Sequence, residues 1–136
     1  MDKIFLDTSF LISYYNTLDE NHLKAEEMMN KLSEGDFEVL ISDYVFSECC
    51  TVLLLRLKDF KKSIQVCEAI KNIEMLKVND LCFEKTWSLF KEQSGTKMSF
   101  TDCSTQALMD TNGIKQIATF DEDFGKIKGI SVFEGR

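Results

Sequence analysis

The sequence has no proline, a single histidine (His22) and no apolar run of membrane-spanning length. A membrane-spanning helix needs about 20 consecutive apolar residues, so we expect no contact with a membrane. The amino terminus shows no basic segment followed by an apolar core, and a secretory signal is therefore not predicted. We expect a cytoplasmic protein whose helix ends are set by capping residues and glycine rather than by proline.

The cysteines do not form a metal-binding pattern. There are five, an odd number, and no two have C-x-x-C spacing. A structural zinc site usually needs such pairs together with histidine. We therefore expect free and mostly buried thiols, as is usual in a reducing compartment.

Positive charge is also scarce. The chain has 16 Lys and Arg but 23 Asp and Glu, which gives a net charge of −7. A protein that binds nucleic acid normally uses Lys and Arg to contact phosphates. Two interpretations follow: the partner is not a nucleic acid, or many acids gather in one place and bind metal cations. The densest basic stretch, residues 56–62, could guide RNA, but a solvated helix end is an equally good interpretation.

The pattern of apolar residues predicts one α/β domain spanning residues 1–136, since no linker or repeat divides the chain. Strands are predicted at 3–6, 38–41, 73–78, 116–119 and 130–133, and helices at 8–15, 21–32, 43–58, 60–70, 81–93 and 101–112. The third helix, with its apolar run at 52–55, should be buried on most sides. Thr101 is expected to cap the last helix.

Strands that alternate with helices indicate a five-stranded parallel sheet with helices on both faces, a three-layer α/β/α architecture. In such sheets ligands bind beyond the carboxyl ends of the strands, where the strand order reverses. Trp87 and most of the eleven phenylalanines are expected in the core, so base stacking by any one of them is not favoured.

Four acidic residues stand where such a site would form. Asp7 directly follows the first strand, Asp121 follows the strand at 116–119, and Asp102 and Glu48 lie in the first turns of two helices. Each alone has an ordinary explanation, because Asp often caps a helix or forms a turn and favours the positive end of the helix dipole. Glu48 is less ordinary, since its neighbours are apolar and a lone buried carboxylate is costly.

Together, the four acids favour a metal site. Clustered carboxylates repel one another unless a cation neutralises them. Mg²⁺ and Mn²⁺ prefer oxygen ligands and support the activation of water for attack on a phosphate. Such cations would also offset part of the net charge where RNA must approach.

The same residues resemble the sequence motifs of the PIN-domain family, and of its VapC-like toxin branch in particular. The matches keep the order and spacing of that family over nearly the whole chain. They are residues 5–12 (FLDTSFLI), 21–25 (NHLKA), 42–48 (SDYVFSE), 99–102 (SFTD) and 118–124 (ATFDEDF).

The resemblance implies a Mg²⁺- or Mn²⁺-dependent endoribonuclease. Asp7, Glu48 and Asp102 would be the principal metal ligands and Asp121 the fourth acid. The resemblance also suggests auxiliary residues: Thr8 or Ser9, and Thr119, which would offer hydroxyl groups near the site, and Asp123 as an alternative fourth acid. It further implies a small antitoxin as partner and a homodimer.

Rival hypotheses remain open at this point. Phosphatases with an aspartyl nucleophile need D-x-D after the first strand, but Ser9 stands two residues beyond Asp7. A non-catalytic PIN scaffold would usually have lost one of the acids, and all four are present. A solitary RNA-processing nuclease and a DNA-directed nuclease share the same chemistry, since fold does not determine the substrate.

Overall fold

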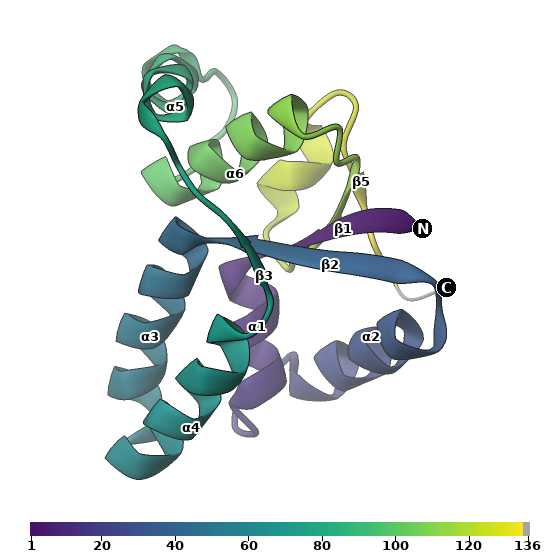
Figure 1. The fold of residues 1–136 in the computed structure, drawn as a ribbon, viewed down its shortest axis with the longest axis vertical. Coiled ribbons are helices and arrows are strands. Elements are labelled where there is room, and N and C mark those ends of the chain that lie inside the picture. The colour runs from purple at the N-terminus through teal and green to yellow at the C-terminus, as the bar shows by residue number, and fades with distance from the viewer. Residues whose placement is uncertain (135–136) are drawn as a thin grey trace.

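The computed structural model describes residues 1–134, which form a parallel sheet between two layers of helices. Figure 1 shows α1, α2, α3 and α4 on one side of the sheet, and α5, α6 and a 3₁₀ helix on the other. The strands are β1 (Asp2–Leu6), β2 (Phe37–Ser42), β3 (Glu74–Leu76), β4 (Gln116–Ala118) and β5 (Ser131–Val132). The helices are α1 (Thr8–Tyr15), α2 (His22–Glu34), α3 (Asp43–Leu57), α4 (Phe60–Lys71), α5 (Asp80–Glu92), α6 (Phe100–Thr111) and the 3₁₀ helix η1 (Glu122–Lys126).

The sheet has five parallel strands in the order β3-β2-β1-β4-β5, which confirms the predicted architecture. From β1 the chain winds outward through β2 to β3, then returns to the other side of β1 to form β4 and β5. The strand order therefore reverses between β1 and β4. In open α/β sheets this reversal leaves a crevice at the carboxyl ends of the two strands.

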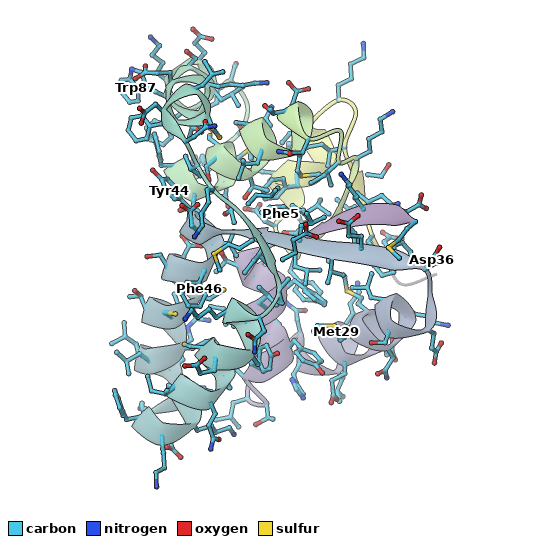
Figure 2. The ribbon with its side chains drawn as sticks, viewed as in Figure 1. Phe5, Met29, Asp36, Tyr44, Phe46 and Trp87 are labelled. Carbon is cyan, nitrogen blue, oxygen red and sulfur yellow. The ribbon has the colours of Figure 1, made fainter. Side chains whose placement is uncertain are left out.

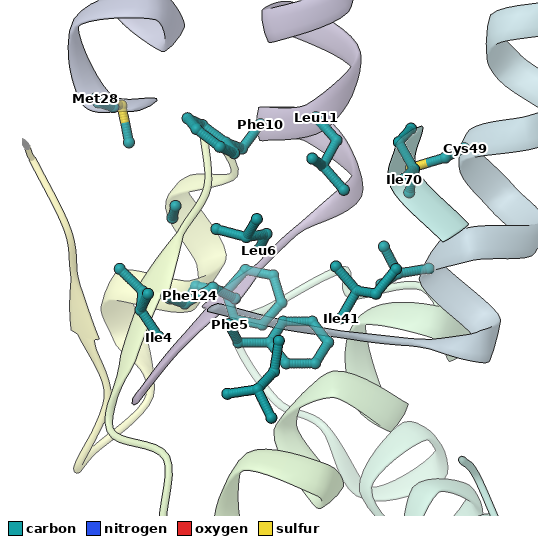
Figure 3. Close-up of a cluster of buried hydrophobic side chains, with 14 of the residues drawn as sticks. Ile4, Phe5, Leu6, Phe10, Leu11, Met28, Ile41, Cys49, Ile70 and Phe124 are labelled. Carbon is teal, nitrogen blue, oxygen red and sulfur yellow. The ribbon is translucent and has the colours of Figure 1, made fainter. Parts of the chain in front are cut away.

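The core is centred on β1, whose Ile4, Phe5 and Leu6 are fully or almost fully buried. Figure 3 shows these side chains together with Phe10 of α1 and Phe124 of η1. Both faces of β1 are thus covered, as expected for a central parallel strand. The rigid centre of the sheet fixes the position of the residue that follows β1.

The structure differs from the sequence predictions in three ways. The helix η1 was not predicted, and it forms because the Asp121 side chain accepts a hydrogen bond from the Asp123 backbone N–H (2.9 Å) and turns the chain after β4. The edge strands β3 and β5 are shorter than predicted, because each pairs with a single neighbour over two or three residues. Helix α3 is not buried on most sides, since Leu54 and Leu55 are exposed.

Trp87 was expected in the core, but the residue is 46% exposed. Figure 2 shows it on α5, at the outer edge of the molecule. Helix α5 packs against α6 through Cys82 and Leu89, which leaves its other face open. A helix that rests on one neighbour buries only one side, and the apolar pattern of its sequence does not reveal which aromatic residues stay outside.

The cysteines and the helix lengths agree with the sequence predictions. All five cysteines are free thiols in the part of the chain described, and Cys49, Cys82 and Cys103 are buried. Cys103 packs in the main core, as expected for a small thiol beside a site residue. Across residues 1–134, every helix is too short or too polar to span a bilayer.

Candidate active site

The four acids singled out from the sequence line one hollow of about 380 Å³ at the carboxyl ends of β1 and β4. Asp7 follows β1 directly, Asp121 follows β4, Glu48 lies in the second turn of α3, and Asp102 lies in the first turn of α6. The hollow is therefore the crevice that the strand order predicts. Segments far apart in the sequence meet there because the parallel strands all end at the same edge of the sheet.

Asp7 is the most deeply held of the four acids, with only 2% of its surface exposed. Its backbone N–H continues the ladder by donating to the Ala118 carbonyl of β4 (3.0 Å). One carboxylate oxygen, Oδ2, accepts hydrogen bonds from Ser9 Oγ (2.9 Å) and Thr119 Oγ1 (2.7 Å). The other, Oδ1, is buried and has no hydrogen-bond partner among residues 1–134.

The electrostatics of Asp7 follow from this burial. The pKa of the carboxyl is raised from 3.8 to about 6. Loss of solvent is the largest cause and the nearby charge of Asp102 adds to it, while the hydrogen bonds from Thr119 and Ser9 oppose the shift. The Asp7 carboxylate is therefore a group that a cation would stabilise. Its unpartnered Oδ1 is the atom available for that role.

The Ser9 and Thr119 side chains connect the segments that follow β1 and β4 and bind this carboxylate. Besides donating to Asp7, Ser9 Oγ accepts from the Phe120 backbone N–H (3.0 Å), and Thr119 Oγ1 accepts from the Asp121 backbone N–H (3.0 Å). Both hydroxyls thus hold Asp7 in position and connect it to the segment that carries Asp121. Thr8 also lines the hollow, but its own hydroxyl is buried and finds no partner in the described chain.

Asp102 is positioned by the start of α6. The Ser99 side chain accepts from the Asp102 backbone N–H (3.1 Å), and Asp102 Oδ2 accepts from the Ser99 backbone N–H (3.1 Å), which makes a capping box. The predicted cap, Thr101, is thus wrong: Ser99 caps the helix, which begins at Phe100. Partial burial raises the pKa of Asp102, and the charges of Asp121 and Glu48 raise it further.

Glu48 is held by a well-capped helix. Ser42 at the end of β2 accepts from the Val45 backbone N–H (3.0 Å) and starts α3. Glu48 then lies one turn into that helix, beside the buried Cys49, whose pKa is raised by burial and by the charges of Asp7 and Glu48. The alternative fourth acid, Asp123, faces elsewhere: it accepts from the Lys97 backbone N–H (3.0 Å) and pairs with Lys126, and these contacts lower its pKa.

Several residues of the hollow were not identified from the sequence. Asp19 accepts hydrogen bonds from Ser13 Oγ (2.9 Å) and the Asn21 backbone N–H (2.9 Å), and all three residues line the hollow. Arg56, within the basic stretch noted above, supplies the cationic lining. Ser99 could have been found from the pattern S-x-x-D at 99–102, which is a capping-box signature.

The donor set fits a hard divalent cation. All four acids contribute carboxylate oxygens, the ligands that Mg²⁺ and Mn²⁺ prefer. In Asp7, Asp102 and Asp121 one oxygen is engaged in a hydrogen bond that fixes the side chain, and the other has no hydrogen bond to residues 1–134. As the side chains stand in residues 1–134, no three of His, Cys, Asp or Glu converge closely enough to hold a metal ion.

Comparison with known proteins gives a family and a fold. The family model of the PIN domain matches residues 4–130. No curated protein matches the sequence. Solved structures do match over nearly their whole length.

The structure of VapC20 from Mycobacterium tuberculosis, described as a toxin that cleaves the sarcin-ricin loop, aligns with a TM-score of 0.82 and 23% identity, covering 93% of this chain and 96% of that one. VapBC2 from Rickettsia felis, bound to a DNA fragment from its promoter, aligns with a TM-score of 0.73 and 14% identity, over 96% of both chains. DNA-bound VapBC from Salmonella typhimurium gives 0.70 and 21%, over 97% of both chains. At these identities the likeness establishes the fold.

Proposed function

The chain belongs to the PIN domain family, and from this premise we propose that it is a divalent-metal-dependent endoribonuclease that hydrolyses phosphodiester bonds in RNA. One observation carries the proposal. The four carboxylates line a single hollow at the point where the strand order reverses, and the innermost of them, Asp7, is buried with its pKa raised to about 6 and one oxygen unpartnered among residues 1–134. A purely structural aspartate would have both oxygens satisfied.

In this proposal Asp7, Glu48 and Asp102 hold Mg²⁺ or Mn²⁺, and Asp121 is the fourth acid. The bound cation would lower the pKa of a water molecule and stabilise negative charge on the phosphate oxygens. Thr119 and Ser9 keep the Asp7 carboxylate in place, Ser99 does the same for Asp102, and Asp121 orients the attacking water. Arg56, the cation of the hollow, offsets the charge of the RNA phosphates.

We also propose that the protein is the toxin of a toxin–antitoxin pair, that a small antitoxin protein is its partner, and that it acts as a homodimer in the cytoplasm. The support is the likeness to VapC20 and to chains of VapBC complexes. The free thiols agree with a reducing compartment. Growth arrest on expression, relieved by co-expression of the protein encoded by an adjacent gene, would test this assignment.

The decisive test of the nuclease is RNA cleavage by the purified wild-type protein, first with Mn²⁺ and then with EDTA. The same assay is repeated with the Asp102→Asn variant. Asp110→Asn is a matched control, because it makes the same change on the same helix at an exposed position outside the hollow. We expect cutting that needs metal, disappears in Asp102→Asn and persists in Asp110→Asn. The products should carry a 5′-phosphate and a 3′-hydroxyl.

Two outcomes would reject the proposal. Products ending in a 2′,3′-cyclic phosphate would mean that the 2′-hydroxyl of the RNA attacks, with no need for the four acids to activate water. Absence of both cleavage and metal binding would favour a non-catalytic PIN scaffold. Equal cleavage of RNA and DNA would change the substrate class, and RNA cleavage by a protein whose expression does not arrest growth would identify a solitary processing enzyme.

A further inference from the structure

Three aromatic side chains of α5 lie on the surface, on one face of the helix. Phe83, Trp87 and Phe90 are spaced by four and three residues, which places them on the same side, and these residues are 44%, 46% and 37% exposed. Large aromatic rings gathered in the open are unusual unless something covers them. Figure 2 shows Trp87 at the outer edge of the molecule.

The rings continue from α5 towards the body of the protein. Phe100, the first residue of α6, has its ring 5.4 Å from Phe83 and 5.8 Å from Phe90, while Phe90 is stacked on Trp87 at 6.2 Å. On its other side Phe100 lies 6.3 Å from Tyr44 of α3. We call these five side chains (Tyr44, Phe83, Trp87, Phe90 and Phe100) the aromatic row.

The aromatic row leads to the candidate active site. Tyr44 lines a second hollow, of about 420 Å³, together with Glu48 and Thr101. Glu48 and Ser99 also line the hollow of the four acids. Phe100 therefore lies, in the sequence, between Ser99 of that hollow and Thr101 of the second hollow. A chain whose phosphate lay at the four acids could therefore extend past Glu48 onto the rings.

The chemistry of the aromatic row suits nucleic acid bases. Every base has a flat face that stacks on an aromatic ring whatever its identity. The Lys91 ammonium group, 5.9 Å from the centre of the Trp87 ring, is placed to meet a phosphate beside a stacked base. The exposed apolar surface on α3 and α4 differs because it consists mainly of the aliphatic Leu54, Leu55 and Ile64, with the single ring of Phe60, and so it offers no row of adjoining flat faces.

We propose that the aromatic row is the docking surface for unpaired bases of the RNA, next to the bond that is cut. The inference rests on the proposed function and adds to it a specific surface, outside the hollow of the four acids, that contacts the RNA. Bases in a duplex are already stacked on one another and cannot lie against protein rings. The row therefore selects loops, bulges or ends.

Trp87 is the only tryptophan of the chain, so its fluorescence reports directly on this surface. We would titrate the Asp7→Asn protein, which should bind RNA without cutting it, with a short single-stranded RNA of mixed sequence and with the same sequence as a duplex. We expect saturable quenching by the single strand and little by the duplex. In a parallel anisotropy assay with labelled RNA, Phe90→Ala and Trp87→Leu should each weaken binding about tenfold.

The matched control is Phe60→Ala on α4, which removes an equally apolar ring that is 69% exposed and lies away from α5 (Figure 1). It should leave RNA affinity unchanged. Unchanged affinity in Phe90→Ala and Trp87→Leu would overturn the proposal. So would a Trp87 signal that depends on protein concentration but not on RNA, because it would assign the aromatic row to contact between two copies of the chain.

These results are distinguishable from a failure of the nuclease assignment. If the wild type cuts RNA but the row variants bind and cut like it, the inference fails and the proposed function stands. If no variant cuts RNA, yet single-stranded RNA quenches Trp87 and the row variants lose affinity, the nuclease assignment fails and the base-docking surface stands.

Discussion

The Thr119 hydroxyl donates a 2.7 Å hydrogen bond to Asp7 Oδ2, although the two residues are 112 positions apart in the sequence. The same hydroxyl oxygen accepts from the Asp121 backbone N–H at 3.0 Å. One side chain after β4 thus fixes both the innermost acid, which follows β1, and the segment that carries Asp121. Because the hydrogen bond to Asp7 favours the charged carboxylate, it also lowers a pKa that burial raises.

Replacing Thr119 by valine, which keeps the shape and removes the hydroxyl, should therefore raise the pKa of Asp7 above 6 and weaken metal binding at neutral pH. We expect RNA cleavage to fall by about 10- to 100-fold, the usual effect of losing a group that positions a metal ligand. Carbon-13 NMR of the aspartate carboxyls would follow the titration. Thr111→Val is the control, since its hydroxyl donates only to the Ala107 carbonyl within α6; an equal loss of activity there would contradict the assigned role.

The raised pKa of Asp7 predicts how the metal-free protein responds to pH. Between 3.8 and about 6 the folded chain retains a proton that the unfolded chain has lost. The free energy of unfolding should therefore fall as the pH rises through this window and level off above it. At neutral pH the buried charge of Asp7 lowers the free energy of unfolding by about 2–3 kcal/mol. Protonation of Asp7 removes this penalty.

Asp7→Asn should accordingly stabilise the metal-free protein by about 1–2 kcal/mol at neutral pH, less than the full charge penalty because the amide group is left without a partner. At about pH 4, where the native carboxyl is already protonated, the gain should vanish. Urea unfolding in EDTA at the two pH values measures both. A variant that was destabilised at neutral pH would show that the charge of Asp7 is compensated in the free protein.

The sequence was sufficient to place Asp7, Glu48, Asp102 and Asp121 around one hollow, for a physical reason. Parallel strands end at one edge of the sheet, so an acid directly after a buried strand must lie at that edge. Asp7 follows Leu6, and Leu6 pairs with Ala118, three residues before Asp121. Which of Asp121 and Asp123 faces the hollow depended on η1, a turn formed by side-chain hydrogen bonds that the apolar pattern does not show.

Exposure was harder to predict than position in the chain. Helix α5 has the periodic apolar pattern of an ordinary amphipathic helix. Cys82 and Leu89 pack against α6, but α6 alone does not cover all the apolar residues of α5. Only the packing of the whole chain shows that Trp87 stays outside. The hydroxyls of Ser9 and Thr119 were expected near the metals, but their hydrogen bonds to Asp7 required the register of β1 and β4.

Metal binding should be visible as stabilisation, because a cation that binds only the folded protein raises its free energy of unfolding. With Mn²⁺ at 100 times its Kd, the gain should be about 2.7 kcal/mol at neutral pH. Protons compete for the same carboxylates, so the gain should shrink below the pKa of Asp7, which is about 6. Thermal unfolding with and without EDTA checks this, with Asp7→Asn losing the shift and Asp110→Asn keeping it; a full shift in Asp7→Asn would place the cation elsewhere.

Asp102 serves both the start of α6 and the hollow, and two substitutions separate these roles. Ser99→Ala removes the acceptor for the Asp102 backbone N–H, so we expect a loss of about 1 kcal/mol of stability. Cleavage should fall about tenfold, since Asp102 keeps its charge but loses part of its positioning. Urea unfolding and a cleavage assay with saturating Mn²⁺ measure the two effects.

Asp102→Asn should instead keep the stability of the protein and abolish its cleavage of RNA. The asparagine oxygen can still accept from the Ser99 backbone N–H, so the cap survives. Removing a charge whose pKa is raised by burial and by Asp121 and Glu48 should leave the metal-free protein as stable as the wild type or more so. Cleavage should nevertheless disappear, because a neutral amide is a poor ligand for Mg²⁺ or Mn²⁺. If Asp102→Asn lost stability in proportion to activity, Asp102 would be a capping residue of α6 and the site would have to be built from the remaining three acids.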